Sequence, residues 1–297
     1  MTNGGIPESA TIPALLVRGR TIPEAWEKSV LELWEKGVRV RTEYDKPGNP
    51  PSRDATMTMV VDEPMAEPRI HMAFPGGIED LEKYRQEVLF GVHDHWIRPE
   101  EGKWTYTYHQ RIFKYEVVDD LSSSTVKSKY PPVDQMALAV EKLAEAPHSR
   151  RAQAITWMPT ADPKTDDPPC LQRLWFRILF DESGVGWLNM NSHWRSRDAY
   201  KAAFMNIYAL TDLQRDMAEK ISKKTGKDVR VGRYVDLTDS YHIYGSYFDE
   251  FEKGFLKLVN KRSFEQRTWS SDNPNVKYSI DVARKQLDEE RKKEGRK

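Results

Sequence analysis

The sequence has almost no cysteine and no long hydrophobic run. Cys170 is the only thiol among 297 residues, which excludes an intramolecular disulfide and any metal or redox site built on paired cysteines. No apolar run approaches the roughly 18 residues that a membrane helix needs, and the N-terminus lacks a basic segment followed by an apolar one. We therefore expect a protein without a membrane span or secretory signal, located in the reducing cytoplasm.

Neither positive nor negative charge is in excess. The chain has 46 Lys and Arg against 46 Asp and Glu, a formal net charge of zero. A general nucleic-acid binder normally carries a basic excess, so we expect no nucleic-acid polymer as a partner. The 9 Trp, 13 Tyr and 10 Phe supply large apolar side chains for a folded core.

Helical and extended patterns alternate irregularly along the chain. Apolar residues at helical spacing predict helices at 21–37, 79–90, 135–146 and 199–223, and a mixed-charge, solvated helix after Trp269. Alternating or β-rich runs predict strands at 56–61, 104–108, 152–157, 171–180, 186–190, 229–237 and 240–247. Because βαβ alternation is absent, we expect an α+β fold, with a flexible segment at 1–20, one domain at 21–265 and a charged extension at 266–297.

Two arginines and one cysteine are the first candidates for chemistry. Arg150 and Arg151 follow a helix that Pro147 ends, and two adjacent guanidiniums suit a phosphate. A solvated, basic helix end is the alternative. Two prolines precede Cys170 and an apolar strand follows it, an arrangement that suits a catalytic thiol and an inert buried one equally.

A third candidate is the segment 194–198, which we expect to open a helix. Ser196 or Asp198 would cap that helix, or Arg195 and Ser196 would form a second phosphate clamp. Several arginines and a cysteine without an overall basic excess favour a small phosphorylated ligand over a polymer.

Together these segments resemble thymidylate synthase, in the variant form of archaea and some bacteria. The resemblance rests on four ordered motifs, at 134–151, 168–170, 195–206 and 241–244. It implies a large mixed β-sheet packed with helices and a homodimer formed sheet to sheet. The implied reaction transfers a one-carbon unit from 5,10-methylenetetrahydrofolate to C5 of a pyrimidine nucleoside monophosphate, dUMP to dTMP in the first instance.

The resemblance assigns the chemical step to Cys170, which would add to C6 of the pyrimidine ring. Nearby arginines are expected to lower the pKa of its thiol. Glu87 resembles the general acid–base glutamate, although a helix-surface glutamate would look the same. Tyr106 or Tyr108 matches the active-site tyrosine of the family, with Arg111 as the arginine that follows it.

The resemblance also assigns the residues that bind the two reactants. Arg195 and Ser196 would bind the phosphate within the subunit, Arg150 and Arg151 would reach it from the partner subunit, and Arg53, or else Arg41, would be the mobile phosphate-loop arginine. Asn206 would read the base, and its carboxamide suits uracil. His242 and Tyr244 would bind the sugar 3′-hydroxyl, Asp198 would act in catalysis and bind the pterin ring, and Trp96 would pack on the folate. No metal site is assigned.

The C-terminus departs from the family pattern. Thymidylate synthases end in a short apolar tail that helps to close the site, whereas this chain ends in a charged segment. A different lid would admit water, which gives a nucleotide 5-hydroxymethylase acting on dUMP, dCMP or CMP as the alternative. A catalytically silent nucleotide- or RNA-binding relative is a third reading, which Cys170, Glu87 and Asp198 oppose.

Overall fold

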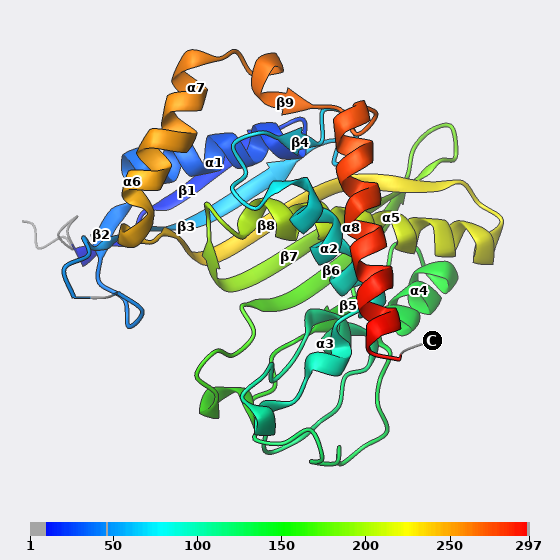
Figure 1. Ribbon diagram of the computed structural model, residues 1–297. Helices are drawn as coiled ribbons and strands as arrows, with labels where there is room; N and C mark the ends of the chain where they lie inside the picture. The colour runs from blue at the N-terminus through cyan, green and yellow to red at the C-terminus, as the bar shows by residue number, and fades with distance from the viewer. Residues whose placement is uncertain (1–9, 46, 296–297) are drawn as a thin grey trace, which may run out of the picture.

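The computed structural model describes residues 10–45 and 47–295, and a mixed seven-stranded sheet forms their centre (Figure 1). The strands run in the order β1-β3-β8-β7-β6-β5, with β2 paired to β3. Their bounds are Ala14–Gly19 for β1, Val38–Val40 for β2, Ser52–Val61 for β3, Gln153–Ile155 for β5, Leu171–Phe180 for β6, Gly186–Asp198 for β7 and Val229–Ile243 for β8. β1–β3 and β7–β8 are parallel and the other pairs antiparallel, so the expected mixed sheet is confirmed.

Helices cover one face of this sheet in successive layers (Figure 1). α1 and α5 pack on the strands, α2 packs on α5, and α8 packs on α2. The α-helices span Ile22–Lys36 (α1), Gly77–Phe90 (α2), Tyr108–Phe113 (α3), Gln135–Glu145 (α4), Ala203–Thr225 (α5), Phe248–Phe251 (α6), Lys257–Lys261 (α7) and Pro274–Lys293 (α8). A separate two-stranded sheet joins β4 (Ile70–His71) to β9 (Thr268–Trp269).

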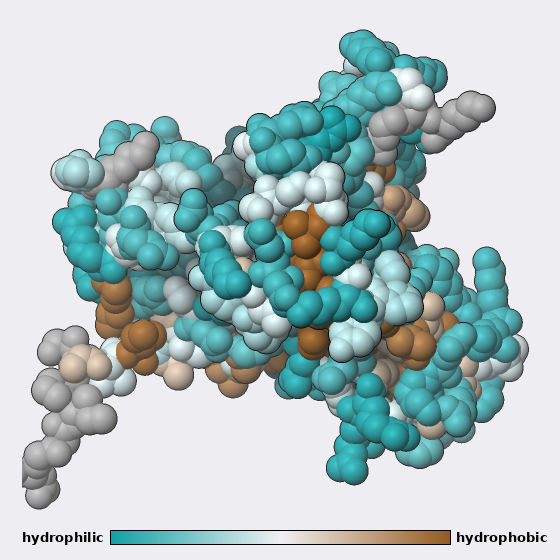
Figure 2. Space-filling model, turned by 90° about the horizontal axis from the view of Figure 1, so that it is seen from below, coloured by the Kyte–Doolittle hydropathy of each residue, from teal (hydrophilic) through white to brown (hydrophobic). Residues whose placement is uncertain are grey.

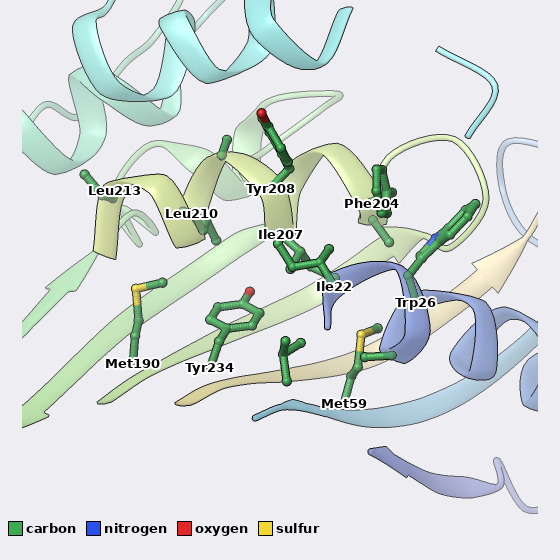
Figure 3. Packing of buried hydrophobic residues seen from close by; sticks show 14 of the residues in the cluster. Ile22, Trp26, Met59, Met190, Phe204, Ile207, Tyr208, Leu210, Leu213 and Tyr234 are labelled. Carbon is green, nitrogen blue, oxygen red and sulfur yellow. The ribbon is translucent and has the colours of Figure 1, made fainter. Parts of the chain in front are cut away.

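The main core lies between the sheet and the helices α1 and α5 (Figure 3). Trp26 of α1 and Phe204 of α5 are fully buried, with ring centroids 5.0 Å apart. The indole N–H of Trp26 donates to the carbonyl of Ala199, 2.8 Å away, so this large side chain leaves no unpaired donor in the core. The contact fixes α1 against the turn that connects β7 to α5.

The opposite face of the sheet is open to solvent in this chain. Strand register aligns Leu16, Thr58, Leu237 and His193 in one row across four neighbouring strands. Because alternate residues of a strand share a face, Trp187 lies on the same side as His193. Leu16 is 71% exposed and Trp187 is 38% exposed. Large apolar side chains are therefore left uncovered on this face.

Strand β7 is longer than the sequence suggested, and this corrects the prediction that 194–198 opens a helix. Burial alternates along β7 as far as Trp194, and its pairing with β8 continues to Asp198. The apolar pattern is interrupted because the buried residues Ser192 and Arg197 are polar. The helix α5 starts only at Ala203.

Other segments also differ from the predictions. The runs 229–237 and 240–247, predicted as two strands, form the single strand β8, which ends at Ile243. Residues 14–19, placed in a flexible segment, form strand β1, whereas residues 1–9 lie outside the described chain. The run 104–108 is not a strand, because the Thr107 hydroxyl accepts a hydrogen bond from the Gln110 N–H, 2.9 Å away, and thereby caps α3. The C-terminal helix α8 is charged but not fully solvated, since Val276 and Ala283 are buried against the rest of the molecule.

No helix in residues 10–45 and 47–295 is long and apolar enough to cross a membrane.

Candidate active site

Cys170 occupies the loop that leads into β6, and Arg195 of β7 holds that loop. The Arg195 guanidinium donates through Nε to the carbonyl of Pro169 (3.0 Å) and through Nη2 to that of Pro168 (2.6 Å). The backbone N–H of Arg195 donates to the carbonyl of Cys170 at 2.9 Å. The structure thus brings together the predicted nucleophile and one predicted phosphate ligand. Ser196, the next residue of β7, is partly exposed beside them.

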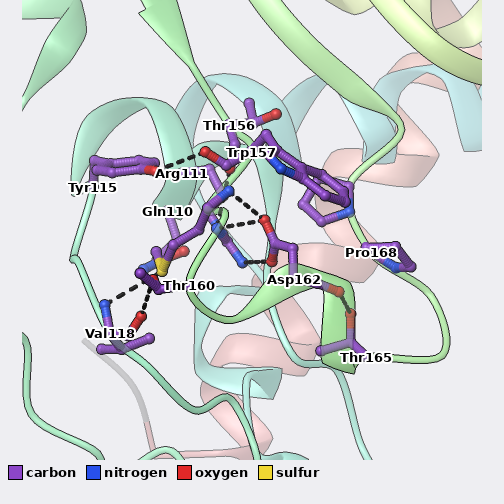
Figure 4. Close-up of polar contacts among 12 residues, drawn as sticks. Gln110, Arg111, Tyr115, Val118, Thr156, Trp157, Thr160, Asp162, Thr165 and Pro168 are labelled. Carbon is purple, nitrogen blue, oxygen red and sulfur yellow. Dashed lines mark hydrogen bonds and ion pairs between the residues drawn. The ribbon is translucent and has the colours of Figure 1, made fainter.

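A buried ion pair anchors the chain that precedes Cys170 (Figure 4). Arg111 and Asp162 are 1% and 0% exposed, and Nη2 of Arg111 lies 2.6 Å from Oδ1 of Asp162. Nη1 of Arg111 also donates to the carbonyl of Thr156 (3.0 Å), and Asp162 accepts the N–H of Met158 (2.6 Å). These bonds fix both ends of the 156–162 segment. Arg111 therefore acts as a structural anchor of the nucleophile loop.

The thiol of Cys170 is partly buried, and burial raises its pKa above the ordinary value. Arg195 and Arg197 oppose this effect, while the nearby carboxylate of Asp167 adds to it. The two arginines thus lower the thiol pKa in the predicted direction, but in the isolated chain desolvation outweighs their attraction and the net pKa is raised. The thiol is protonated at neutral pH before any ligand or partner arrives.

Two tyrosines stand beside this thiol. The hydroxyl of Tyr108 accepts the N–H of Leu171 at 3.3 Å, and the Tyr106 ring lies 5.7 Å from that of Tyr108. Burial raises the pKa of both phenols, and the proximity of Cys170 raises both further. Both tyrosines that the sequence proposed are therefore at the site as neutral phenols.

A cavity of about 1020 Å³ opens next to these tyrosines. Its walls come from α2, from the segment 93–109 and from the loop that precedes Cys170. Apolar and aromatic side chains of Val88, Trp96, Trp104 and Met205 line it together with the carboxylates of Glu87 and Asp167. The cavity combines these aromatic walls with many polar and charged side chains, among them Lys83 and Asp166, and its size is that of a small-molecule site.

Glu87 lies in the wall of this cavity and has a histidine partner. Its Oε1 is 2.7 Å from Nδ1 of His93. The imidazole of His93 stacks on Trp96, with ring centroids 3.9 Å apart. The predicted residues Glu87 and Trp96 are thus brought together by His93, which the sequence analysis missed because no motif includes it.

The base-reading candidate Asn206 is buried near the start of α5 and is bonded to Tyr84 of α2. Nδ2 of Asn206 donates to the Tyr84 hydroxyl at 2.7 Å. Burial raises the pKa of Tyr84, so its hydroxyl stays neutral. Tyr84 also lines the large cavity and was missed, although it lies one helical turn before Glu87 on the same face.

His242 lies at the end of β8 with one ring nitrogen bonded and the other free. Its Nδ1 is 3.2 Å from the carbonyl of Ser240 and donates to it, while Nε2 is buried without a partner among the described residues. Burial lowers the pKa of His242 to about 4, so the ring is neutral and Nε2 is an acceptor. Tyr244 packs edge-on against it at 4.6 Å. The pair suits a ligand hydroxyl that donates a hydrogen bond.

Asp198 ends β7 directly beside these residues, paired in register with His242. Its Oδ1 accepts the N–H groups of Tyr200 (2.9 Å) and Lys201 (2.8 Å). Desolvation nevertheless dominates and raises its pKa to about 6. The carboxyl of Asp198 therefore gains or loses its proton near pH 6.

The phosphate-loop candidates Arg53 and Arg41 are placed differently. The guanidinium of Arg53 donates to the carbonyl of Gly37 (3.0 Å) and lies over the ring of Trp34 (5.2 Å), with no contact to Arg195 in the described chain. Arg41 is exposed on the loop between β2 and β3. Tyr44 of that loop is close enough to Arg195 for its pKa to be affected by the guanidinium. Nη1 of Arg41 donates to the carbonyl of Asn49 at 2.6 Å, which holds this side chain within its own loop.

Arg150 and Arg151 lie in the turn between α4 and the edge strand β5. Both side chains are exposed, and the carbonyl of Arg150 accepts the indole N–H of Trp175 at 3.0 Å. No contact of Cys170 or Arg195 in the described chain involves either of them. The structure does not bring these two arginines into the site of their own subunit.

No cluster of histidine, cysteine or carboxylate side chains in the described part of the chain is arranged to hold a metal ion.

Comparisons with known proteins match this arrangement to one family. A family model described as "Thymidylate synthase" matches residues 74–286. A protein of Methanosarcina mazei named "Putative thymidylate synthase" is 29% identical over 82% of this chain and 96% of its own length, and one of the same name from Methanococcoides burtonii is 26% identical over 80% and 93%. The thermostable thymidylate synthase A from Bacillus subtilis superposes with a TM-score of 0.52 at 19% identity, covering 80% of this chain and 84% of that chain. This last likeness confirms the predicted fold.

The buried pair of Arg111 and Asp162 gives a prediction for stability. Asp162→Asn leaves the guanidinium buried without a countercharge, so the free energy of unfolding should fall by about 3–5 kcal/mol in urea titrations. The matched control is Asp249→Asn, whose pair with Lys253 is exposed to solvent, so that its loss should leave the free energy of unfolding nearly unchanged. Equal stability of the two variants would contradict the anchoring role.

The raised pKa of Asp198 gives a prediction for pH dependence. The folded chain binds the Asp198 proton more tightly than the unfolded chain, so this stabilisation is complete below the ordinary pKa near 4 and is lost as pH rises through about 6. Between pH 4 and 7, Asp198→Asn should therefore gain up to about 3 kcal/mol of unfolding free energy relative to the unmodified protein. If urea titrations show a difference in unfolding free energy between the two proteins that does not change with pH, the raised pKa of Asp198 is refuted.

Proposed function

The chain belongs to the thymidylate synthase family, a family of one-carbon transferases, and on that premise we propose that it converts dUMP to dTMP. The observation that carries the proposal is the position of Cys170, between a guanidinium that holds its loop and the tyrosines of a large cavity. One side of the thiol offers an anion-binding group, and the other offers room for a second reactant.

The nucleotide would lie along the ends of β7 and β8. Arg195 uses Nε and Nη2 for the loop carbonyls, so Nη1 stays available for a 5′-phosphate. The bare Nε2 acceptor of His242 suits the 3′-hydroxyl of the sugar. With both ends of the nucleotide held, Sγ of Cys170 attacks C6 once its proton has left, and C5 becomes nucleophilic.

Asn206 supports uracil as the base. One hydrogen of Nδ2 is used by Tyr84, which leaves the second hydrogen for O4 and the carbonyl Oδ1 for N3–H. Tyr84 is neutral and buried, so it holds the carboxamide in this orientation. Cytosine would present a donor at position 4 to the same amide hydrogen.

The cavity beside the tyrosines fits the folate that the family uses. Its volume of about 1020 Å³ and its aromatic walls at Trp96, Trp104 and Tyr106 suit a flat pterin and its attached ring. 5,10-Methylenetetrahydrofolate would supply the one-carbon unit and, for thymidylate, the hydride that reduces it. Glu87, in the cavity wall, would move protons near the pyrimidine ring, and Asp198, which lies outside the cavity lining at the end of β7, would bind the part of the pterin that reaches toward the nucleotide.

A second candidate function is nucleotide 5-hydroxymethylation. A second cavity, of about 500 Å³, lies between α2 and α8, and His93 lines both cavities. Water that reaches Glu87 from this side would compete with the hydride and give a hydroxymethyl product.

We further propose a homodimer formed through the open face of the sheet. That face carries exposed apolar residues of several strands, and Figure 2 shows apolar patches among the hydrophilic surface on one side of the molecule. Arg150 and Arg151 are exposed at the edge of this sheet and have no place in the site of their own subunit. A partner related by a twofold axis would carry them to the neighbouring phosphate site.

The product is tested by incubating the protein with 5,10-methylenetetrahydrofolate and dUMP, dCMP or CMP in turn. Thymidylate synthesis should raise the absorbance of dihydrofolate with dUMP alone, whereas hydroxymethylation would consume the nucleotide without that signal. Cys170→Ser should lower turnover by at least about a thousandfold, because the nucleophile is lost. Full turnover in that variant would exclude the covalent mechanism.

The shared site is tested by mixing two impaired variants under conditions that exchange subunits. One variant is Cys170→Ser, and the other carries Arg150→Ala and Arg151→Ala. If the arginines act across the interface, an equal mixture should regain about a quarter of the unmodified activity, since half of the dimers hold one complete site. No regain in mixtures that exchange subunits would place the arginines within their own subunit.

A further inference from the structure

His93 lies between two carboxylates that come from distant parts of the chain. Its Nδ1 is 2.7 Å from Oε1 of Glu87 on α2, and its Nε2 is 3.4 Å from Oε2 of Glu290 on α8. The second distance is long for a hydrogen bond but within the range of an ion pair. The C-terminal helix therefore reaches the cavity glutamate through a single imidazole.

The imidazole is held in one orientation by its surroundings. It is 5% exposed, it stacks on Trp96 with planes 8° apart, and Trp104 meets its edge at 6.2 Å. A ring packed in this way cannot turn its nitrogens away from the carboxylates without opening the aromatic cluster. The direction of the Glu87 carboxylate is accordingly set by the position of His93.

The charges around His93 favour its protonated form. Burial opposes the charge, but hydrogen bonds and ion pairing with Glu87 and then Glu290 together raise the pKa of His93. With both ring nitrogens facing carboxylates, the imidazolium can donate to each. Other ionisable groups nearby are His95, whose ring centroid lies 6.3 Å away and whose Nε2 pairs with Glu294, and the α8 side chains Arg284, Asp288 and Arg291 that line the adjoining cavity.

We propose that His93 is a positioning residue for Glu87 and that Glu290 of α8 holds His93 in this role. In this proposal the C-terminal helix helps to position the acid–base group, in addition to packing on α2. The inference rests on the proposed function, in which Glu87 moves protons near the pyrimidine ring. It assigns to the charged extension a task that its sequence alone does not indicate.

The anchoring of α8 makes the inference testable without unfolding the helix. Val276 and Ala283 are buried, and Nε of Arg284 lies 2.8 Å from Oε1 of Glu82. Glu290→Gln keeps the size of the side chain and leaves these contacts in place. Glu289→Gln is the matched control, because Glu289 is an exposed neighbour with the same charge on the same helix.

The first experiment follows the titration of His93 by NMR in the protein without ligands, with the resonance assigned from its loss in His93→Asn. Glu290→Gln should lower the pKa of His93 by about one pH unit, because a partner carboxylate is removed. Glu289→Gln should leave it unchanged. An equal pKa in both variants would overturn the contact between α8 and His93.

The second experiment measures the release of tritium from C5 of labelled dUMP across pH 5 to 9. His93→Asn should lower kcat by about tenfold to a hundredfold with little change in KM for dUMP, since a small misplacement of the acid–base group slows the reaction but not binding. Glu290→Gln should move the alkaline limb of the profile to lower pH, and Glu289→Gln should not. If neither His93→Asn nor Glu290→Gln changes the pH profile, the inference is refuted. If the unmodified protein turns over C5 of neither dUMP, dCMP nor CMP, the proposed function is refuted instead.

Discussion

The hydrogen bonds from Arg195 to the carbonyls of Pro168 and Pro169 are the contacts on which the site depends. They tie the end of β7 to the loop that presents Cys170, and no proline N–H is available to hold that loop by itself. Hydrogen bonds from a charged donor contribute about 1.5–3 kcal/mol each. In the proposed function the same guanidinium would also bind the 5′-phosphate, so that the positions of the thiol and of the phosphate would be set together.

In the isolated chain the thiol of Cys170 is held in its protonated, less reactive form. Burial and the carboxylate of Asp167 raise its pKa more than Arg195 and Arg197 lower it. A protonated thiol is protected from oxidation and from other electrophiles. If Cys170 is the nucleophile of the proposed function, it must lose this proton before it attacks, and Tyr106 and Tyr108 are neutral phenols whose pKa values the nearby thiol affects.

The sequence predicted those features of the structure that depend on local patterns of residues. The run 171–180 matched β6 to the residue because apolar residues recur along its whole length, and the motifs around Cys170 and Arg195 pointed to two segments that the structure brings into contact. Tyr84 and His93 were missed because their partners Asn206 and Glu290 lie 122 and 197 residues away. Contacts of that range depend on how α2, α5 and α8 are layered, which no local pattern records.

The buried pair of Arg197 and Asp236 explains why β7 remains a strand through polar sequence. Arg197 is 3% exposed and forms a bidentate ion pair with Asp236 of β8, which also accepts from the hydroxyls of Tyr234 and Ser192. A buried pair is weak support for stability, but it permits only one register between its two strands. That register places Asp198 beside His242. The same polar residues that interrupt the apolar pattern of β7 thus fix its register with β8, and with it the position of Asp198.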